Sequence, residues 1–169
     1  MAEPIPQEEA HTISLYVRNK PGALVRIALV FARRGYNIDS LVVSPGAQGE
    51  FSRMTITCRG DLAILQQIIK QLQKQVDVVH AIDHTIDAHY ETEIALIKLA
   101  CDLDGRTEIL QVAEHYNAKV VDYGAESLIL RIYGSSDKLD SVVALLHRYN
   151  MVELVRSGKI LMARGRALT

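Results

Sequence analysis

One order of strand and helix patterns runs twice along this chain of 169 residues, and it limits the fold more than any single motif does. In the first half the order is strand, helix, strand, strand, helix, strand, over the segments 12–18, 22–34, 38–44, 51–59, 62–72 and 76–86. The strand segments have the two-residue period of half-buried strands, and each helix segment carries one apolar stripe. This order predicts an antiparallel sheet with both helices on one face, because right-handed crossovers place them there.

The second half repeats the same order after a polar stretch. Its strands are predicted at 94–100, 119–122, 127–133 and 151–156, with one helix after Gly105 and another capped by Ser136. We therefore predict an α+β protein made of two ferredoxin-like βαββαβ sandwiches in tandem. The predicted parts are a flexible N-terminal tail, a first domain, a linker and a second domain, over 1–10, 11–86, 87–92 and 93–169.

Composition argues against several classes of function. Hydrophobic residues make up 49% of the chain and the formal net charge is −1, so no overall positive charge favours nucleic acid. No apolar run is long enough to cross a membrane. The acidic, proline-containing start is unlike a signal peptide, so a cytoplasmic protein is expected. Cys58 and Cys101 lack the short paired spacing of redox or zinc motifs, and both are predicted to be buried hydrophobic side chains.

The turn after the first strand has the composition of an anion-binding helix start. The residues that lead into the helix are Asn19, Lys20, Pro21, Gly22, Ala23 and Leu24. Pro21 suits a first turn because it has no N–H to satisfy, and Gly22 has no Cβ to keep a ligand from the backbone. The first N–H groups of a helix lack intrahelical partners and, with the helix dipole, favour a carboxylate. The same residues are also consistent with an ordinary helix start that binds nothing.

A second segment, around Asn37 and Ile38, is expected to complete this site. We expect the end of the first strand and the start of the second at the same edge of the sheet, so that paired subunits bring Asn37 of one chain toward Gly22 of another. An Asn amide there suits the ammonium or carboxylate of a small amino acid, with Leu24, Ile38 and Leu41 against its side chain. The open face and edges of such sheets also favour pairing with another copy, which predicts at least a dimer.

The sequence shows no evident catalytic or metal centre. It contains no phosphate-binding loop, dinucleotide fingerprint, nucleophile elbow or helical pair of metal-binding histidines. His80, His84 and His89 share one extended segment, but every two strand residues advance about 6.6 Å, so we expect a solvated edge strand and no metal site. RNA-binding sandwiches stack bases on strand aromatics, whereas Phe51 is the one Phe or Tyr in 51–59, so no nucleic-acid partner is expected.

Several segments together resemble one protein family. They are Asn19–Leu24, Arg34–Leu41, Ser52–Ile56, Gln71–Val79, Glu93–Lys98 and Val155–Gly158. Over nearly its whole length the chain resembles the regulatory, or small, subunit of acetohydroxyacid synthase, also called acetolactate synthase. Its first half resembles the amino-acid-sensing ACT domain, and its second half resembles the C-terminal ferredoxin-like domain of that family.

The resemblance implies a noncatalytic subunit that activates a separate catalytic subunit and confers feedback inhibition by valine, and sometimes by leucine or isoleucine. Thiamine diphosphate, magnesium and FAD would belong to that catalytic partner and not to this chain. The family's effector lies between the ACT domains of a dimer, which implies Asn19, Gly22, Ala23 and Leu24 here, with Asn37 and Ile38 of the neighbouring chain. Two other functions stay open at this point: a free-standing amino-acid sensor acting on another enzyme or on transcription, and a small enzyme in its own right.

Overall fold

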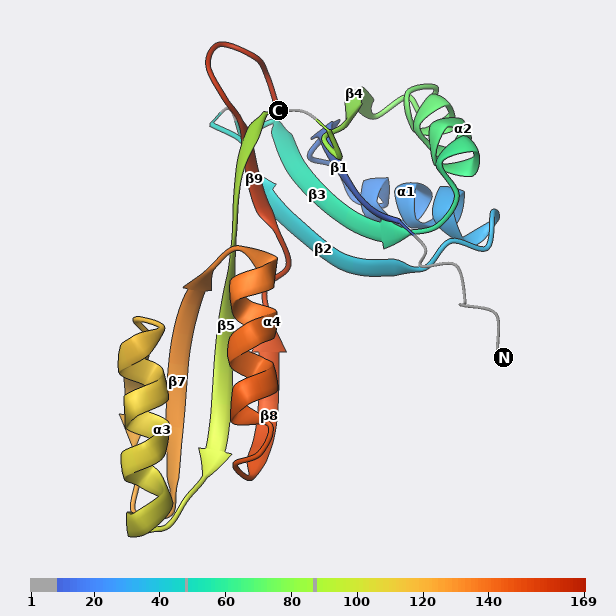
Figure 1. The fold of residues 1–169 in the computed structure, drawn as a ribbon. Helices are drawn as coiled ribbons and strands as arrows, with labels where there is room; N and C mark the ends of the chain where they lie inside the picture. Colours follow the sequence, from blue (N-terminus) through green and yellow to red (C-terminus); the bar gives the residue numbers. More distant parts are fainter. Residues whose placement is uncertain (1–8, 48, 87) are drawn as a thin grey trace, which may run out of the picture. The chain divides into compact units, whose positions relative to one another are not determined.

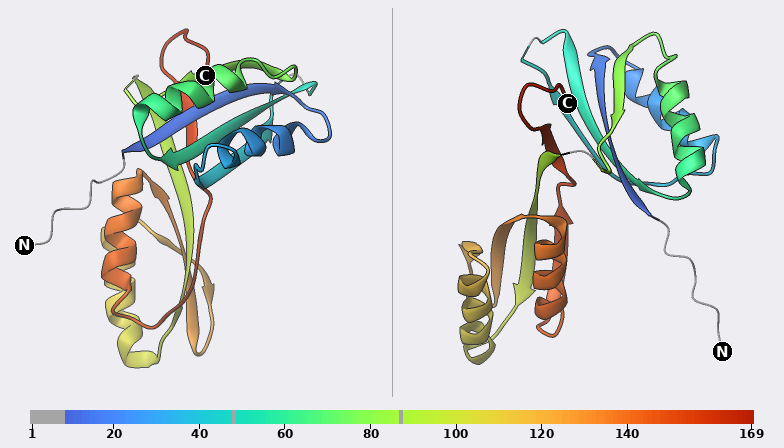
Figure 2. Two further views of the ribbon diagram at one scale, coloured as in Figure 1. Left: turned by 90° about the vertical axis from the view of Figure 1, so that its right-hand side faces the viewer. Right: turned by 45° about the horizontal axis from the view of Figure 1, so that its top comes forward.

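The computed structural model describes residues 9–47, 49–86 and 88–169, which divide into two compact units. The first unit contains the described residues up to Tyr90 together with Lys159–Thr169, and the second contains Glu91–Gly158. In each unit both helices cover one face of an antiparallel sheet (Figures 1 and 2). The predicted fold class, two ferredoxin-like sandwiches in tandem, is confirmed.

The first unit has the predicted βαββαβ order. Its elements are β1 (Ala10–Arg18), α1 (Ala23–Ala32), β2 (Ile38–Pro45), β3 (Phe51–Arg59), α2 (Leu62–Leu72) and β4 (Val78–Asp83). The sheet order is β2-β3-β1-β4, and neighbouring strands pair antiparallel. Because α1 connects β1 to β2, it passes over β3 and lies toward the β2 edge, whereas α2 passes over β1 toward β4.

Alternate strand residues and the inner faces of α1 and α2 form the core of this unit. Its fully or nearly buried members are Ile13, Leu15, Val17, Ile27, Val30, Phe31, Met54, Ile56, Cys58, Leu65, Ile68, Leu72, Val78 and Ala81. Burial, with the nearby Asp39 and Asp83 carboxylates, raises the pKa of the Cys58 thiol to about 11. Cys58 is thus buried as predicted, whereas Cys101 in the second unit is half-buried.

The second unit repeats the topology with a separate core. Its elements are β5 (His89–Ala100), α3 (Leu103–His115), β6 (Lys119–Tyr123), β7 (Ser127–Gly134), α4 (Ser136–Leu146) and β8 (Met151–Arg156). The strand order is β6-β7-β5-β8, again antiparallel. Its buried residues are Ala95, Ile97, Leu99, Ile109, Ala113, Leu128, Leu130, Ile132, Leu139, Val142 and Leu146.

Both helix starts in the second unit differ from the prediction. The helix expected after Gly105 begins earlier, because the Asp102 carboxylate accepts a hydrogen bond from Gly105 N at 2.9 Å and caps α3. The cap of α4 is Ser135, whose Oγ accepts from Lys138 N at 3.4 Å. Ser136, the predicted cap, instead donates to the Glu93 carboxylate. The N-cap is the residue whose side chain can reach the free amides of the first turn. Where several polar residues are adjacent, the sequence does not show which of them does so.

The chain boundaries also differ from the expected ones. Strand β5 begins at His89, inside the stretch 87–92 that the sequence suggested as a linker, and β1 begins at Ala10, inside the expected tail 1–10. Residue 87 and residues 1–8 of that tail lie outside the described residues. An additional strand, β9 (Ile160–Ala163), pairs with β5. The expected second domain ran to residue 169, whereas Lys159–Thr169 group with the first unit.

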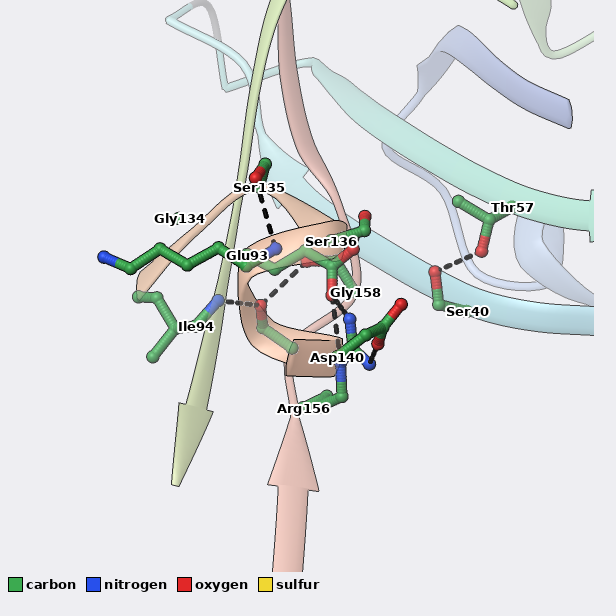
Figure 3. A network of polar contacts seen from close by, with 12 residues as sticks. Ser40, Thr57, Glu93, Ile94, Gly134, Ser135, Ser136, Asp140, Arg156 and Gly158 are labelled. Carbon is green, nitrogen blue, oxygen red and sulfur yellow. Dashed lines mark hydrogen bonds and ion pairs between the residues drawn. The ribbon is translucent and has the colours of Figure 1, made fainter. Parts of the chain in front are cut away.

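A buried carboxylate joins three elements of the second unit (Figure 3). Glu93 of β5 lies near the first residue of the second unit, is 5% exposed and accepts hydrogen bonds from Ser136 of α4 and from Arg156 of β8. Arg156 binds the carboxylate through Nη2 at 2.6 Å and Nε at 3.1 Å, and also reaches Asp140 at 2.5 Å. A carboxylate buried this deeply is costly without such partners, so the network holds together the end of the unit where its chain enters and leaves.

We expect Arg156→Met to destabilise the second unit by about 3 kcal/mol, the lower end for breaking a buried ion pair, because Arg156 keeps partial exposure. The substitution leaves Glu93 buried without its cation. Amide hydrogen exchange in β5 and β7 reports this unit directly and should accelerate by roughly a hundredfold. Arg131→Met, at an exposed β7 position, is the control. Equal exchange in the two variants would show that the network contributes little.

Candidate functional site

The loop 19–24 lies at one end of the first sheet and is held by two neighbouring connections. Arg18 N donates to Asp77 O at 2.8 Å, which joins the end of β1 to the segment before β4. Asn19 N donates to Glu50 O at 2.8 Å, and its side-chain Nδ2 lies 3.4 Å from Gly49 O. The loop is therefore positioned mainly by main-chain hydrogen bonds to these two connections.

Helix α1 starts without a side-chain cap. Gly22 occupies the N-cap position in the left-handed region, with φ 81° and ψ −8°, and no acidic residue lies in the first turn. Ala23 N is bonded to Lys20 O at 3.2 Å, whereas Leu24 N and Val25 N have no hydrogen-bond partner within the described part of the chain. Free amides at the positive end of the helix dipole favour a carboxylate.

Two cationic side chains, Lys20 and Arg26, belong to this helix start, and one neighbouring side chain offers apolar surface. Lys20, Pro21 and Gly22 are exposed, and the Leu24 side chain is 41% exposed. The guanidinium of Arg26 forms an ion pair with Asp77, and its Nη1 lies 3.2 Å from where a Cβ on Gly22 would be. The arrangement suits a small ligand that carries a carboxylate and an aliphatic group.

Sequence reasoning missed Arg26 as a member of this site. Its position four residues after Gly22, one helical turn on, was the signal that could have found it, because residues at that spacing share a helix face.

Asn37 and Ile38 do not lie beside the loop within one copy of the chain, and the expectation that both segments share one edge was wrong. Arg18 pairs with Phe51, whereas Ile38 pairs with Cys58. These two β3 residues are seven positions apart, or about 24 Å along a strand. The reason is that α1 carries the chain along the length of the sheet before β2 begins. Asn37 is exposed and its Nδ2 lies 3.4 Å from Asp39 Oδ1.

β4 is an edge strand, as expected, but the histidines His80 and His84 are more covered than a solvated strand would leave them. His80 is half-buried and donates through Nε2 to a main-chain oxygen of Thr169 at 2.9 Å. His84 is 2% exposed, with Nε2 at 2.8 Å from Ser14 Oγ. Tertiary contacts from distant segments cover these side chains, which a local pattern does not show. Among the described residues no group of histidine, cysteine and acidic side chains is arranged to hold a metal ion.

No helix in the described ranges has the length and apolar character needed to cross a membrane.

Comparison with known proteins finds one family over both units. Residues 13–80 match a family model described as an AHAS small subunit-like ACT domain, and residues 92–165 match the model for the small subunit of acetolactate synthase.

Two relatives and one solved structure illustrate the similarity. A probable acetolactate synthase small subunit of Archaeoglobus fulgidus is 38% identical, over 92% of this chain and 97% of the relative. The acetolactate synthase small subunit of Mycolicibacterium smegmatis is also 38% identical, over 92% of this chain and 91% of the relative. The crystal structure of the small subunit from Thermotoga maritima superposes with a TM-score of 0.83 at 34% identity, covering 94% of this chain and 99% of the other.

Proposed function

The chain belongs to the acetolactate synthase small-subunit family, with an ACT domain as its first unit, and from this membership we propose that it confers feedback inhibition by branched-chain amino acids, chiefly valine. In this proposal it carries no catalytic residues, and it binds and activates a separate catalytic subunit. Thiamine diphosphate, magnesium and FAD belong to that partner. The uncapped start of α1, with free amides at Leu24 and Val25, is the observation that most directly supports an amino-acid effector.

The chemistry of the loop matches the two ends of valine. Its carboxylate accepts hydrogen bonds from the free amides of the first turn, and the Arg26 guanidinium, which is ion-paired with Asp77, lies beside Gly22. The partly exposed Leu24 side chain contacts the isopropyl group. An acidic residue in the first turn would repel such a ligand, and α1 has none.

A homodimer through the β2 side of the first unit supplies the rest of the pocket. β2 is an edge strand, so its outer backbone groups are free to pair with another strand. On the adjoining helix α1, Leu24, Val25 and Leu29 are 41%, 62% and 44% exposed, an apolar stripe that favours burial. Edge pairing with a second copy would cover both features at once.

The two-fold symmetry of such a dimer explains how Asn37 takes part. Two copies related by a two-fold axis place their β2 strands antiparallel, so the start of one strand meets the end of the other. The end of β2 lies at the loop, because Pro45 pairs with Ser52 while Arg18 pairs with Phe51. Asn37 and Ile38 of one copy then reach the Asn19–Leu24 loop of the other, where the Asn37 amide bonds the effector.

Valine bound between the two copies favours the dimer geometry that activates the catalytic subunit less well. The coupling is bounded by the difference in affinity of the two states for valine, typically about 1 to 3 kcal/mol.

The direct test measures acetolactate formation by the matching catalytic subunit, with and without this protein, while valine is titrated. We expect stimulation that valine reverses. The absence of stimulation with the matching catalytic subunit would contradict the regulatory role and leave a sensor with another target.

Gly22→Asp should abolish the response to valine while leaving stimulation of the catalytic subunit intact, because its carboxylate occupies the place of the effector's carboxylate. Gly22→Asn is the matched control: it imposes the same left-handed backbone strain and nearly the same volume without the charge. Valine titration of the assembled enzyme compares the two. Retained valine inhibition in the Asp variant would place the effector elsewhere.

Asn37→Ala should weaken valine inhibition about tenfold, the scale of one lost hydrogen bond to a charged ligand. Asp39→Ala is the control, because it removes the same local contact with Asn37 Nδ2 but keeps the amide. Isothermal titration calorimetry with valine gives the affinities. An unchanged affinity in Asn37→Ala would argue against a site shared between two copies.

A further inference from the structure

The last segment of the sequence is anchored on the first unit. Arg164 N donates to Ala88 O at 3.3 Å, and Arg164 Nε donates to His89 O at 3.2 Å. Ala163 N donates to Thr169 Oγ1 at 2.7 Å, so the segment folds back on itself after β9. Thr169 is 6% exposed. The segment is thus held at Arg164 and at Thr169, and we call the residues that bind Thr169 its receptor.

That receptor is a row of side chains across the sheet of the first unit. A main-chain oxygen of Thr169 accepts hydrogen bonds from Arg53 of β3 and from His80 of β4, the latter at 2.9 Å. Both residues pair directly with Tyr16 of β1. The neighbours of Tyr16 along β1 point into the core, so this row lies on the face opposite the helices.

Aromatic contacts complete the row. The Tyr16 ring stacks on Phe51 with centroids 5.0 Å apart and on His80 with centroids 5.4 Å apart. The Arg53 guanidinium lies 5.2 Å from the centre of the Tyr16 ring. We call these four residues and Thr169 the latch. Stacking and cation–π contacts fix the orientation of Arg53 and His80, so the two donors converge on one oxygen.

Two residues of the latch lie next to the strand ends that hold the Asn19–Leu24 loop. Phe51 directly follows Glu50, whose carbonyl holds Asn19 N. On the other strand, Tyr16 lies two residues before Arg18, and Arg18 pairs with Phe51. A change in the loop therefore acts on the two strand ends that carry the aromatic part of the latch.

We propose that the latch couples the Asn19–Leu24 loop to the Lys159–Thr169 segment, so that an effector which orders the loop tightens the hold on Thr169. The segment begins at Lys159, directly after Gly158, which is the last residue of the second unit. The coupling rests on the described contacts, and valine as its trigger rests on the proposed function. Ordering of one site by a ligand that stabilises another is a recognised route to coupling.

The coupling is tested first without effector, by hydrogen exchange of the full chain. Arg53→Gln removes one donor to Thr169, and exchange in Lys159–Thr169 should accelerate about tenfold, the scale of a charged hydrogen bond. Because coupling is reciprocal, the amides of Asn19–Leu24 should also exchange faster. Arg59→Gln, on the same strand but paired with Asp39, is the control and should change neither segment.

A second variant distinguishes loss of the latch from general destabilisation of the first unit. His80→Gln removes the other donor and should accelerate the same two segments, while the core amides of β3 keep their protection. Acceleration that spreads equally through β3 in both variants, or no change in Lys159–Thr169, would overturn the proposal.

Addition of valine then separates the coupling from the proposed function. In the original chain both Asn19–Leu24 and Lys159–Thr169 should exchange more slowly, and in Arg53→Gln the slowing should be confined to the loop. Slowing of the loop alone in the original chain would disprove the coupling. No slowing of the loop would instead disprove valine binding there, and the effector-free comparison alone would then decide on the latch.

Discussion

The pairing of β1 with β3 is the constraint on which the first unit depends. Nine consecutive residue pairs, from Ala10 with Arg59 to Arg18 with Phe51, join the two strands without a bulge. One side of this pair supplies the core, with Leu15 and Ile56 fully buried, and the other side carries the latch. At its Arg18 end the same pair positions the Asn19–Leu24 loop. Register fixes all three relations at once, because a shift of one residue would exchange the two faces.

The two units show that one topology can carry different chemistry at the same place. In the first, Arg18 N and Asn19 N bond to Asp77 O and Glu50 O; in the second, Ala100 N and Cys101 N bond to Asn150 O and Glu126 O. The helix that follows differs, however. Asp102 caps α3 with its own carboxylate, whereas Gly22 leaves α1 uncapped. In our proposal a ligand's carboxylate binds the start of α1. In the second unit the Asp102 carboxylate occupies the equivalent place at the start of α3.

Most of the fold was predicted because the spacing of apolar residues in the sequence follows the periods of strands and helices. β3 has the predicted bounds, and α2 covers the predicted segment 62–72, with Asp61 as its cap accepting from Ala63 N at 2.7 Å. The loop residues Asn19–Leu24 were found because glycine and proline mark an unusual helix start. The Glu93–Arg156 pair and strand β9 were not predicted, since their partners lie far away in sequence and leave no periodic signal.

The sequence by itself determined the class of fold, the glycine-marked start of α1 and the resemblance to a regulatory family, because each depends on residue types at short spacing. The tertiary structure alone decided that Ile38 lies at the far end of the sheet from Arg18. It also decided that Arg53 and His80 converge on Thr169. Those relations arise from strand register and from the return of the chain to its first unit, and long-range packing sets both.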